Sequence, residues 1–394
     1  MKHLQRLVLI ILLLLSLGGC GLIPTEREDA ASSTTSPLSG VTAIAAGGLH
    51  TCALMSDRSV KCWGSNLEGQ LGDGTIISKS YPAKVSGINT ATQLAASYHT
   101  CAILTDNTTQ CWGRGDSGQL GDNNSTGSRT PVVVSGLGSA KSIDVLNQYS
   151  CAVLTDNTTM CWGNNYYGGS TPSSVAGITT AQALATGPGH TCVLLNEQTI
   201  QCWGYNNQGQ LGNGTIDICS TNSTGSISCP YNSTPVTVSG ISTGTAIVAG
   251  GDYSCALLSN NTIKCWGRNG KGQLGDGTTL DRSSPVLVSG ISTATSVSAG
   301  GNGTEGHSCA LLSNNSVKCW GNNDYGQLGD GTTTDRSTSV LVSGISTAIA
   351  ISAGFRHTCA LLSDSTVQCW GYNNQGQLGD RTKVSSFTPV NVLN

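Results

Sequence analysis

A cysteine followed after nine residues by Cys-Trp-Gly recurs seven times along the chain. The seven copies lie between residues 52 and 371 and contain all seven tryptophans of the protein. A period of roughly 50 residues is typical of arrays in which each repeat packs against its neighbours. Although 394 residues would ordinarily suggest two or three domains, the repeats predict one closed or stacked array over residues 40–394.

Each repeat offers four short strand candidates separated by turn residues. The first is small and apolar, as in 349–353, and the second runs from a His or Tyr through Cys-Ala-Leu-Leu, as in 357–362. The third enters Cys-Trp-Gly, and the fourth reads Pro-Val-x-Val after a loop with the sequence Gly-Gln-Leu-Gly-Asp-Gly-Thr. Four antiparallel strands per unit, repeated seven times, predict an all-β fold, a seven-bladed β-propeller of four-stranded antiparallel blades.

The two cysteines of each unit are predicted to form a disulfide between the second and third strands. A turn centred on Asp57 would place Cys52 opposite Cys62, and opposed Cα atoms lie about 4.5 to 5.5 Å apart, within disulfide reach. Reduced thiol pairs or a metal site are the alternatives, but no Cys-x-x-Cys motif and no Cys/His cluster at zinc spacing occurs, so neither metal nor cofactor is expected. The predicted disulfides are Cys52–Cys62, Cys101–Cys111, Cys151–Cys161, Cys192–Cys202, Cys219–Cys229, Cys255–Cys265, Cys309–Cys319 and Cys359–Cys369.

The N-terminus predicts export. Lys2 and Arg6 precede an apolar run over residues 7–17 that is short for a membrane span and typical of a signal peptide. The run ends in Leu-Gly-Gly-Cys, which resembles the lipobox of bacterial lipoproteins, and this resemblance implies lipidation of Cys20. A plain signal peptide with a cysteine there by chance is the alternative. Residues 1–20 are expected to be a lipoprotein signal peptide, and residues 21–39 a flexible tether.

The linked motifs of each repeat resemble a known family. Gly-Gly-x-His-Thr-Cys-Ala-Leu, followed by Cys-Trp-Gly-x-Asn-x-x-Gly-Gln-Leu-Gly-Asp-Gly-Thr, is similar to the regulator-of-chromosome-condensation repeat in its cysteine-bearing bacterial form. The resemblance covers about residues 40–394 and implies a seven-bladed propeller. Ring closure stays open, because the chain ends in a full fourth strand at 389–393 and begins with a partial one at 36–41.

Composition and motifs argue against two broad functions. Charged residues make up 10% of the chain and the net charge is −3, so no basic face indicates nucleic-acid binding. Hydrolase and metalloprotease motifs are missing, so the protein is not expected to be an enzyme. Asp144 stands at a first-strand position that other repeats are expected to fill with Ala45, Leu94, Ala185, Val248, Ser298 and Ser352. A hydrogen-bonded or channel-facing carboxylate is favoured there over a catalytic one.

Histidine is concentrated at one repeat position, immediately before the second strand's Thr/Ser-Cys pair. A ring of imidazoles is one interpretation, and it would suggest a metal site. Symmetry would keep equivalent side chains apart, so we expect hydrogen bonds between neighbouring blades, with tyrosine substituting through its hydroxyl in repeats three and five. The residues at this position are His50, His99, Tyr149, His190, Tyr253, His307 and His357.

Three repeats depart from the common pattern. Repeat three lacks Gly-Gln-Leu-Gly, repeat four inserts residues 216–233, and repeat six has a short insertion near 302–305. Loops after the first and third strands leave a blade on the same side, so all three departures are predicted to lie on one rim. Asymmetric positions on a symmetric scaffold can recognise a partner, although neutral loop variation is the alternative. The predicted binding residues are Tyr166, Tyr167, Ile216, Asp217, Ile218 and Tyr231.

Together these features predict a monomeric, lipid-anchored propeller on the extracytoplasmic face of a bacterial cell envelope. Its expected role is an interaction module for an envelope or extracellular protein or glycan. The family resemblance adds an alternative, a regulatory propeller that inhibits an extracellular enzyme such as β-lactamase. An enzyme is the third and least favoured reading, with Asp144 as its candidate residue.

Overall fold

The computed structural model describes residues 36–164, 169–221 and 225–394. Residues 36–394 form one compact unit. The predicted signal peptide, Cys20 and most of the predicted tether lie outside the described residues, as do Tyr166 and Tyr167.

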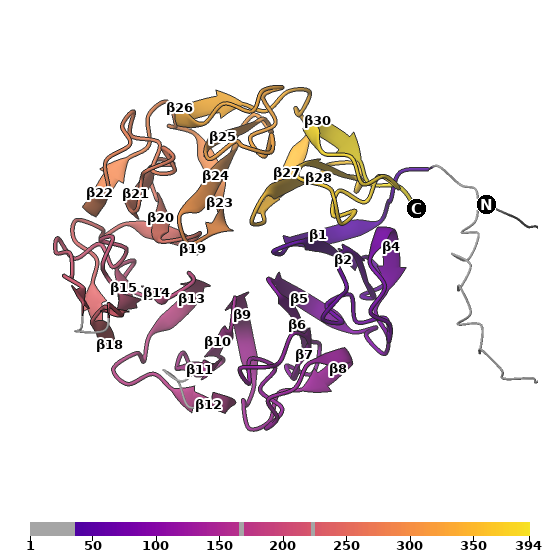
Figure 1. Ribbon diagram of the computed structural model, residues 1–394, viewed down its shortest axis with the longest axis horizontal. Coiled ribbons are helices and arrows are strands. Elements are labelled where there is room, and N and C mark those ends of the chain that lie inside the picture. Colours follow the sequence, from indigo (N-terminus) through magenta and orange to yellow (C-terminus); the bar gives the residue numbers. More distant parts are fainter. Residues whose placement is uncertain (1–35, 165–168, 222–224) are drawn as a thin grey trace, which may run out of the picture. The chain divides into compact units, whose positions relative to one another are not determined.

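The described residues form seven four-stranded antiparallel sheets, each built from strands consecutive in the chain apart from one small hairpin. Figure 1 shows these sheets as blades arranged in a ring around a central axis, with the first strand of each innermost. The fold is therefore the predicted all-β, seven-bladed propeller of four-stranded blades. The sequence predicted this architecture because each blade is specified locally, by period-two strands and short turns.

The first four blades span residues 41 to 237. Blade 1 comprises β1 (Val41–Ala46), β2 (His50–Met55), β3 (Val60–Gly64) and β4 (Lys79–Lys84). Blade 2 comprises β5 (Ala91–Ala96), β6 (His99–Leu104), β7 (Thr109–Gly113) and β8 (Ser128–Val133). Blade 3 comprises β9 (Ala140–Leu146), β10 (Tyr149–Leu154), β11 (Thr159–Gly163) and β12 (Gly169–Ser174). Blade 4 comprises β13 (Ala181–Thr186), β14 (His190–Leu195), β15 (Ile200–Tyr205) and β18 (Tyr231–Thr237), with the hairpin β16 (Ser220–Thr221) and β17 (Ile227–Ser228) between its last two strands.

The remaining three blades follow in the same order. Blade 5 comprises β19 (Gly244–Ala249), β20 (Tyr253–Leu258), β21 (Ile263–Gly267) and β22 (Arg282–Leu287). Blade 6 comprises β23 (Ala294–Asn302), β24 (Glu305–Leu312), β25 (Val317–Gly321) and β26 (Arg336–Leu341). Blade 7 comprises β27 (Ala348–Ala353), β28 (His357–Leu362), β29 (Val367–Gly371) and β30 (Ser386–Asn391).

The hydrophobic core lies between the blades. In one cluster Cys52, Leu54 and Leu71 of blade 1 pack against Ala102 and Trp112 of blade 2. Equivalent clusters fill the spaces between the other neighbours, and all seven tryptophans of the repeats are fully buried. Because each blade buries its tryptophan against the preceding blade, stability comes from nearest-neighbour contacts, as in other repeat proteins.

Within each blade, β-pairing sets the two cysteines opposite each other. Cys52 pairs with Cys62 in the β2–β3 ladder, and their Cα atoms are 4.1 Å apart in a disulfide. The same bridge occurs in every blade, and Cys219–Cys229 forms an eighth disulfide beside the small hairpin. Each closes a loop of about ten residues, so its entropic stabilisation is at most about 3 kcal/mol.

The glycine that follows Gln-Leu in the repeat loop is required by packing against the next blade. Gly72 has φ +67°, and a Cβ built there would lie 2.7 Å from Trp112 Nε1. Gly121 and Gly379 meet the tryptophans of their own neighbouring blades in the same way. A side chain at this position would push the tryptophan out of the core, which explains why the repeat keeps glycine there.

A short N-terminal segment closes the ring against the C-terminal end of the chain. Pro37 forms a β-bridge with Leu393, and the backbone N–H of Leu38 donates to the Val392 carbonyl at 2.8 Å. Leu38 is 1% exposed and packs in the same cluster as Trp63 and Val392. Residues 36–39, expected to end a flexible tether, therefore belong to the propeller and supply the closing contact that the sequence left open.

Candidate recognition surface

A hydrogen-bonded relay joins each histidine blade to the next one. His50 Nε2 lies 2.8 Å from Thr100 Oγ1, and the Thr100 hydroxyl donates to the Gln70 carbonyl at 3.1 Å. The Trp112 indole donates to the same carbonyl at 3.0 Å. Since the threonine hydroxyl donates its own proton to Gln70, it accepts from His50, and the imidazole carries its proton on Nε2. The same histidine–hydroxyl contact joins His99 to Ser150, His190 to Ser254, His307 to Thr358 and His357 to Thr51.

Tyrosine makes an equivalent connection in blades 3 and 5. The Tyr149 hydroxyl donates to the His190 carbonyl at 2.6 Å, and the Tyr253 hydroxyl donates to the His307 carbonyl at 2.6 Å. These are the blade-to-blade contacts that the repeat position suggested. Complete burial lowers the pKa of each of the five histidines to about 3, so the imidazoles are neutral. Among the described residues, no group of three or more His, Cys, Asp or Glu side chains is placed to hold a metal ion.

Immediately outside this relay, one backbone arrangement carries different side chains in different blades. In every blade, the residue after Cys-Trp-Gly donates its N–H to the carbonyl of the residue before the His or Tyr, as Ser65 does to Leu49 at 2.8 Å. We call the accepting positions the inner ring: Leu49, Tyr98, Gln148, Gly189, Asp252, Gly306 and Arg356. We call the donating positions the outer ring: Ser65, Arg114, Asn164, Tyr205, Arg268, Asn322 and Tyr372.

On the other side of the propeller, the turns that connect the second and third strands repeat one hydrogen-bonding pattern. The Asp57 carboxylate accepts from the Ser59 N–H at 2.9 Å and from the Ser59 hydroxyl at 2.6 Å. The same Asp/Asn–x–Ser/Thr turn recurs at Asp106, Asp156, Asn260, Asn314 and Asp364. The side with the inner and outer rings varies from blade to blade, whereas this side is nearly uniform. We name the variable side the recognition face.

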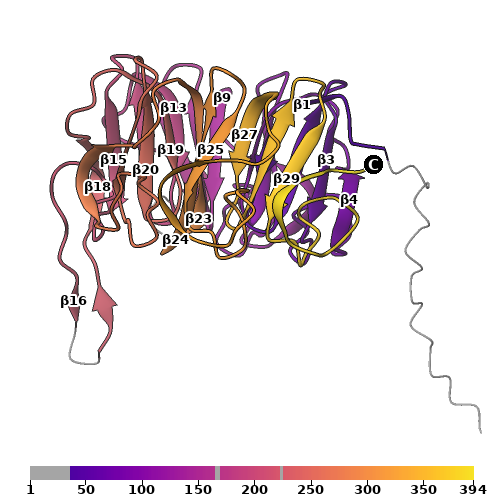
Figure 2. The same ribbon diagram turned by 90° about the horizontal axis from the view of Figure 1, so that it is seen from above.

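The blade 4 hairpin projects from the recognition face, away from the body of the propeller (Figure 2). Its side chains Ile218 and Ile227 are 88% and 73% exposed, and the Cys219–Cys229 disulfide joins its two arms. At its base, the Asp217 carboxylate accepts from the Asn232 amide at 2.7 Å. Tyr231 also anchors the base, packing edge-to-face on Tyr205 with 5.3 Å between ring centroids.

The structure therefore separates the four predicted binding residues that it describes into two groups. Ile216 and Ile218 are exposed and available for contact, with 51% and 88% of their surface open. Asp217 and Tyr231 hold the base of the hairpin. Tyr166 and Tyr167 are outside the described residues.

The loss of Gly-Gln-Leu-Gly from blade 3 has a consequence in blade 4. In the other blades, the tryptophan indole donates to a glutamine carbonyl of the preceding blade, as Trp266 does to Gln210 at 3.0 Å. Trp203 follows blade 3, and its buried Nε1 has no hydrogen-bond partner among the described residues. An unpaired buried N–H costs roughly 1 to 3 kcal/mol, so Trp203 contributes less to stability than the tryptophans of the other blades.

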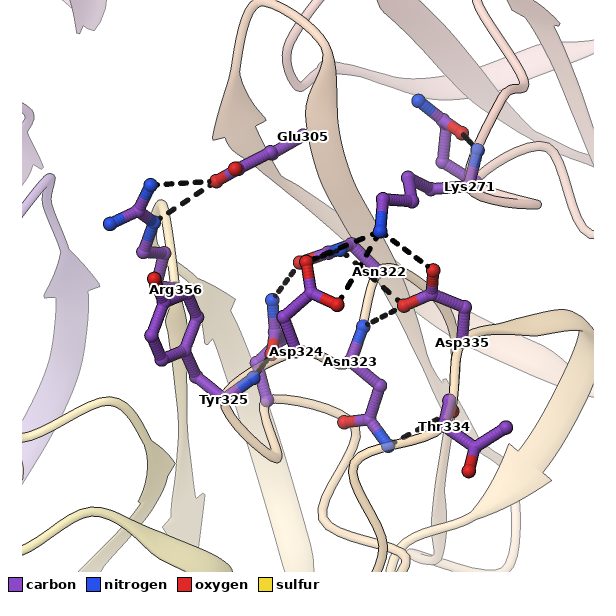
Figure 3. A network of polar contacts seen from close by, with 11 residues as sticks. Lys271, Glu305, Asn322, Asn323, Asp324, Tyr325, Thr334, Asp335 and Arg356 are labelled. Carbon is purple, nitrogen blue, oxygen red and sulfur yellow. Dashed lines mark hydrogen bonds and ion pairs between the residues drawn. The ribbon is translucent and has the colours of Figure 1, made fainter.

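Ion pairs tie the loops of blades 5, 6 and 7 together on the recognition face (Figure 3). Lys271 Nζ lies 3.2 Å from Asp324 and 2.9 Å from Asp335. In the same network, Arg356 contacts the Glu305 carboxylate at 2.9 Å and lies 4.8 Å from the centre of the Tyr325 ring. Glu305 belongs to the predicted insertion of blade 6, so the insertion fixes an inner ring arginine instead of extending freely into solvent.

The axial cavity, about 260 Å³ in volume, is lined by the first strands of all seven blades. Asp144 faces this cavity, and its Oδ2 accepts from the Thr186 N–H at 2.7 Å and from the Thr186 hydroxyl at 2.9 Å. Ser298 and Ser352 accept the equivalent backbone N–H of their own next blades, each at 2.9 Å. Asp144 therefore accepts the same backbone N–H of the next blade that a serine accepts in blades 6 and 7. This agrees with the hydrogen-bonded or channel-facing carboxylate favoured from the sequence.

Burial raises the pKa of Asp144 to about 6, because the cavity wall replaces bulk water around the carboxylate. The β-register also corrects one equivalence drawn from the sequence. In blade 2, Ala95 pairs with Cys101 and occupies the Asp144 position, whereas Leu94 does not.

The inner and outer rings are functional candidates that the sequence analysis did not single out. The insertions and deletions of the repeats do not point to these rings, because the rings differ between blades only in residue type. Aligning the seven copies on the cysteines and reading the residue before each histidine would have found the inner ring.

No helix in the described part of the chain is long and apolar enough to cross a membrane. The eight disulfides suggest an oxidising, extracytoplasmic environment, because such bonds persist outside the cytosol.

Comparison with known families agrees with the repeat pattern. A model of the "Regulator of chromosome condensation (RCC1) repeat" matches more than half of the chain, at residues 59–104, 111–153, 200–257, 265–311 and 315–361. A second model with the same description matches residues 41–70, 182–210, 245–273 and 348–377. The human E3 ubiquitin-protein ligase HERC2 is 27% identical over 96 residues, which are 24% of this chain and only 2% of the ligase.

Solved structures share the fold at low sequence identity. Yeast RCC1 (Prp20), crystallised with Kap60, superposes with a TM-score of 0.70 at 18% identity, over 93% of this chain and 90% of that one. Human WBSCR16 superposes with a TM-score of 0.72 at 19% identity, over 85% of this chain and 94% of that one. At these identities the similarity establishes the propeller architecture alone.

Proposed function

Because the chain belongs to the regulator of chromosome condensation (RCC1) repeat family, we propose that it is an extracytoplasmic interaction module that binds a protein partner through the recognition face. The observation that carries this proposal is the contrast between the two sides of the propeller. One backbone hydrogen bond recurs in all seven blades, yet the side chains it positions include leucine, tyrosine, aspartate and arginine. Such variation on a constant frame suits recognition better than structural support.

The blade 4 hairpin favours a protein as the partner. Ile216, Ile218 and Ile227 expose 51%, 88% and 73% of their surface. Exposed apolar side chains on a braced projection are typical of contacts that become buried on association, while the polar rings beneath would supply specificity.

The N-terminal sequence and the disulfides support export and anchoring. We propose a bacterial envelope protein that is lipidated on Cys20 and held on the extracytoplasmic face, with the residues up to 35 as its tether. Two or more acyl chains anchor a protein stably, whereas one chain does not. Mass spectrometry of the protein purified from membranes tests this: a mature chain beginning at an acylated Cys20 supports it, and cleavage elsewhere without acylation contradicts it.

The test of partner binding uses the hairpin. The immobilised protein is incubated with an envelope fraction, and captured proteins are compared with those captured by an Ile218→Ser/Ile227→Ser variant. Ile349→Ser serves as the control, because Ile349 is likewise an exposed isoleucine, at 51%, but is the second residue of the first strand of blade 7, at the opposite rim. The proposal predicts a specific protein that the double variant loses and the control retains. Equal capture by all three proteins contradicts it.

The stapled, projecting hairpin also favours a narrower candidate, inhibition of an extracellular enzyme. A braced projection can enter an active-site cleft with little loss of conformational freedom, because the Cys219–Cys229 disulfide already restricts it. A β-lactamase inhibition assay with the same variants tests this version. Inhibition that disappears in Ile218→Ser/Ile227→Ser supports it, and unchanged β-lactamase activity at saturating protein rejects that enzyme as the target.

A further inference from the structure

A cavity of about 310 Å³ opens on the recognition face, between blades 2, 3, 4 and 6. We call it the amide pocket, because carboxamide side chains from separate loops surround it. Its lining residues are Tyr98, Arg114, Asn147, Gln148, Tyr149, Asn164, Pro188 and Asn302. At the small end of the usual range for ligand sites, it has room for one compact group.

The carboxamides hold one another in two pairs. Asn147 Nδ2 donates to Asn302 Oδ1 at 3.3 Å, which connects blade 3 with the insertion of blade 6. Asn164 Nδ2 donates to Gln148 Oε1 at 3.3 Å, within blade 3. This pairing fixes the orientation of the groups, so the pocket is preorganised for a ligand.

The side-chain carbonyl of Asn147 lacks a hydrogen-bond donor in the described part of the chain. Its Oδ1 is buried and has no hydrogen-bond partner among the described residues. The residue also has φ 51°, in the left-handed region that asparagine tolerates better than most other residues. A buried carbonyl oxygen without a donor costs stability, and such a group in a folded protein calls for an explanation. A ligand that donates a hydrogen bond to Oδ1 would remove this cost.

The charges around the pocket exclude strongly ionic ligands. Arg114 is already paired with Asp116 through two hydrogen bonds of 2.8 and 2.7 Å, and its guanidinium lies 5.7 Å from the centre of the Tyr98 ring. Its charge is therefore compensated, which disfavours an anion. Among the described lining residues there is no carboxylate to balance a cation.

We propose that the amide pocket binds a neutral sugar residue. A carboxamide offers a donor and an acceptor side by side, and each sugar hydroxyl can both donate and accept. Asn147 Oδ1 would accept from one hydroxyl, while the Gln148 and Asn302 amide groups would donate to others. The small volume of the pocket suits a single or terminal sugar better than the backbone of an extended peptide.

The test is direct titration of the full-length protein with neutral hexoses, 6-deoxyhexoses and N-acetylhexosamines, followed by ligand-observed NMR. At least one sugar is expected to show saturable binding. Asn147→Gly removes the carboxamide while allowing the positive φ, and we expect it to weaken binding at least tenfold. Asn315→Gly is the matched control, because Asn315 also has a positive φ, of 63°, but lies in a turn on the opposite side. Gln148→Ala is a second variant expected to weaken binding.

Two outcomes overturn the proposal: no saturable binding of any neutral sugar, or binding that Asn147→Gly leaves unchanged. If Asn147→Gly abolishes capture of a protein partner while no sugar binds, the pocket recognises a peptide and the sugar assignment is wrong. The readout is independent of the hairpin, so the sugar site and the proposed protein partner can fail separately.

Discussion

Two of the seven blades carry tyrosine where the others carry histidine, and in both cases the next blade has glycine at its inner ring position. Tyr149 precedes Gly189, and Tyr253 precedes Gly306. A Cβ built on Gly306 would lie 2.6 Å from the Tyr253 ring, so the larger side chain requires the glycine. At the residue scale, the buried relay and the inner ring are therefore coupled at Tyr253 and Gly306. A Cβ built on Gly189 would instead lie 2.6 Å from the ring of Tyr205 in its own blade, so the glycine after Tyr149 has a different steric cause.

The buried imidazoles predict acid sensitivity. Burial lowers the folded-state pKa of each from 6.5 to about 3, so the unfolded chain binds more protons below pH 6.5. The contribution of these histidines to the free energy of unfolding should be fully present above pH 6.5. Below that pH it should be lost by roughly 1.4 kcal/mol per pH unit for each histidine. Guanidinium unfolding at several pH values measures the slope.

A swap at one relay position supplies the control for that slope. Tyr253→His should be tolerated, because the neighbouring Ser308 hydroxyl can accept from it as Ser254 does from His190. The variant should take up about one more proton on unfolding. If the pH slope of stability between pH 6.5 and 4 were the same in the variant and the parent, the added imidazole would not be shielded from protonation in the folded protein.

Asp144 predicts the opposite pH dependence. Its folded-state pKa is raised from 3.8 to about 6, so the native protein holds a proton that the unfolded chain releases. Its contribution to stability should therefore fall as pH rises from about 4 to 6, by roughly 3 kcal/mol in all. Asp144→Ser copies blades 6 and 7 and should gain stability relative to the parent as pH rises through this window. Denaturation midpoints at pH 4.5 and 7.5 provide the comparison, and an equal difference at both pH values would contradict the account.

At the scale of the element, the strand hairpins were predictable and their long-range partners were not. The spacing of Cys52 and Cys62 specifies a local ladder, which is why sequence reasoning reached it. The acceptor role of Asp144 depends on Thr186, 42 residues away, and the closing bridge joins Pro37 to Leu393, so neither pairing is encoded in a local pattern. The amide pocket likewise unites residues from four blades.

The disulfides should differ in reactivity between the blades and the hairpin. The fourteen cysteines of the blades are fully buried, whereas Cys219 and Cys229 are partly exposed. Mild reductant under native conditions should therefore open only the hairpin bridge, because thiol exchange needs access to the sulfur. Alkylation and peptide mass spectrometry should label Cys219 and Cys229 first. Simultaneous labelling of the blade cysteines in the folded protein would show that the blades open more readily than their burial implies.

At the scale of the whole molecule, the propeller combines a repeated interior with one varied side. Interblade tryptophans, disulfides and the histidine relay recur around the ring, and the N-terminal segment completes it beside the last strand. The Asp/Asn turns recur on one side, whereas the rings, the blade 6 insertion and the blade 4 hairpin distinguish the other. We infer that this division separates support from recognition.

Site-specific photo-crosslinking in the native envelope tests that division most directly. A photoreactive residue is placed at Leu49 or Ile218 on the recognition face, and at Arg58 or Ile349 on the opposite side as matched positions. The account predicts a discrete crosslinked partner from the first two positions and none from the others. Adducts that form equally on both sides, or only from Arg58 and Ile349, would contradict it.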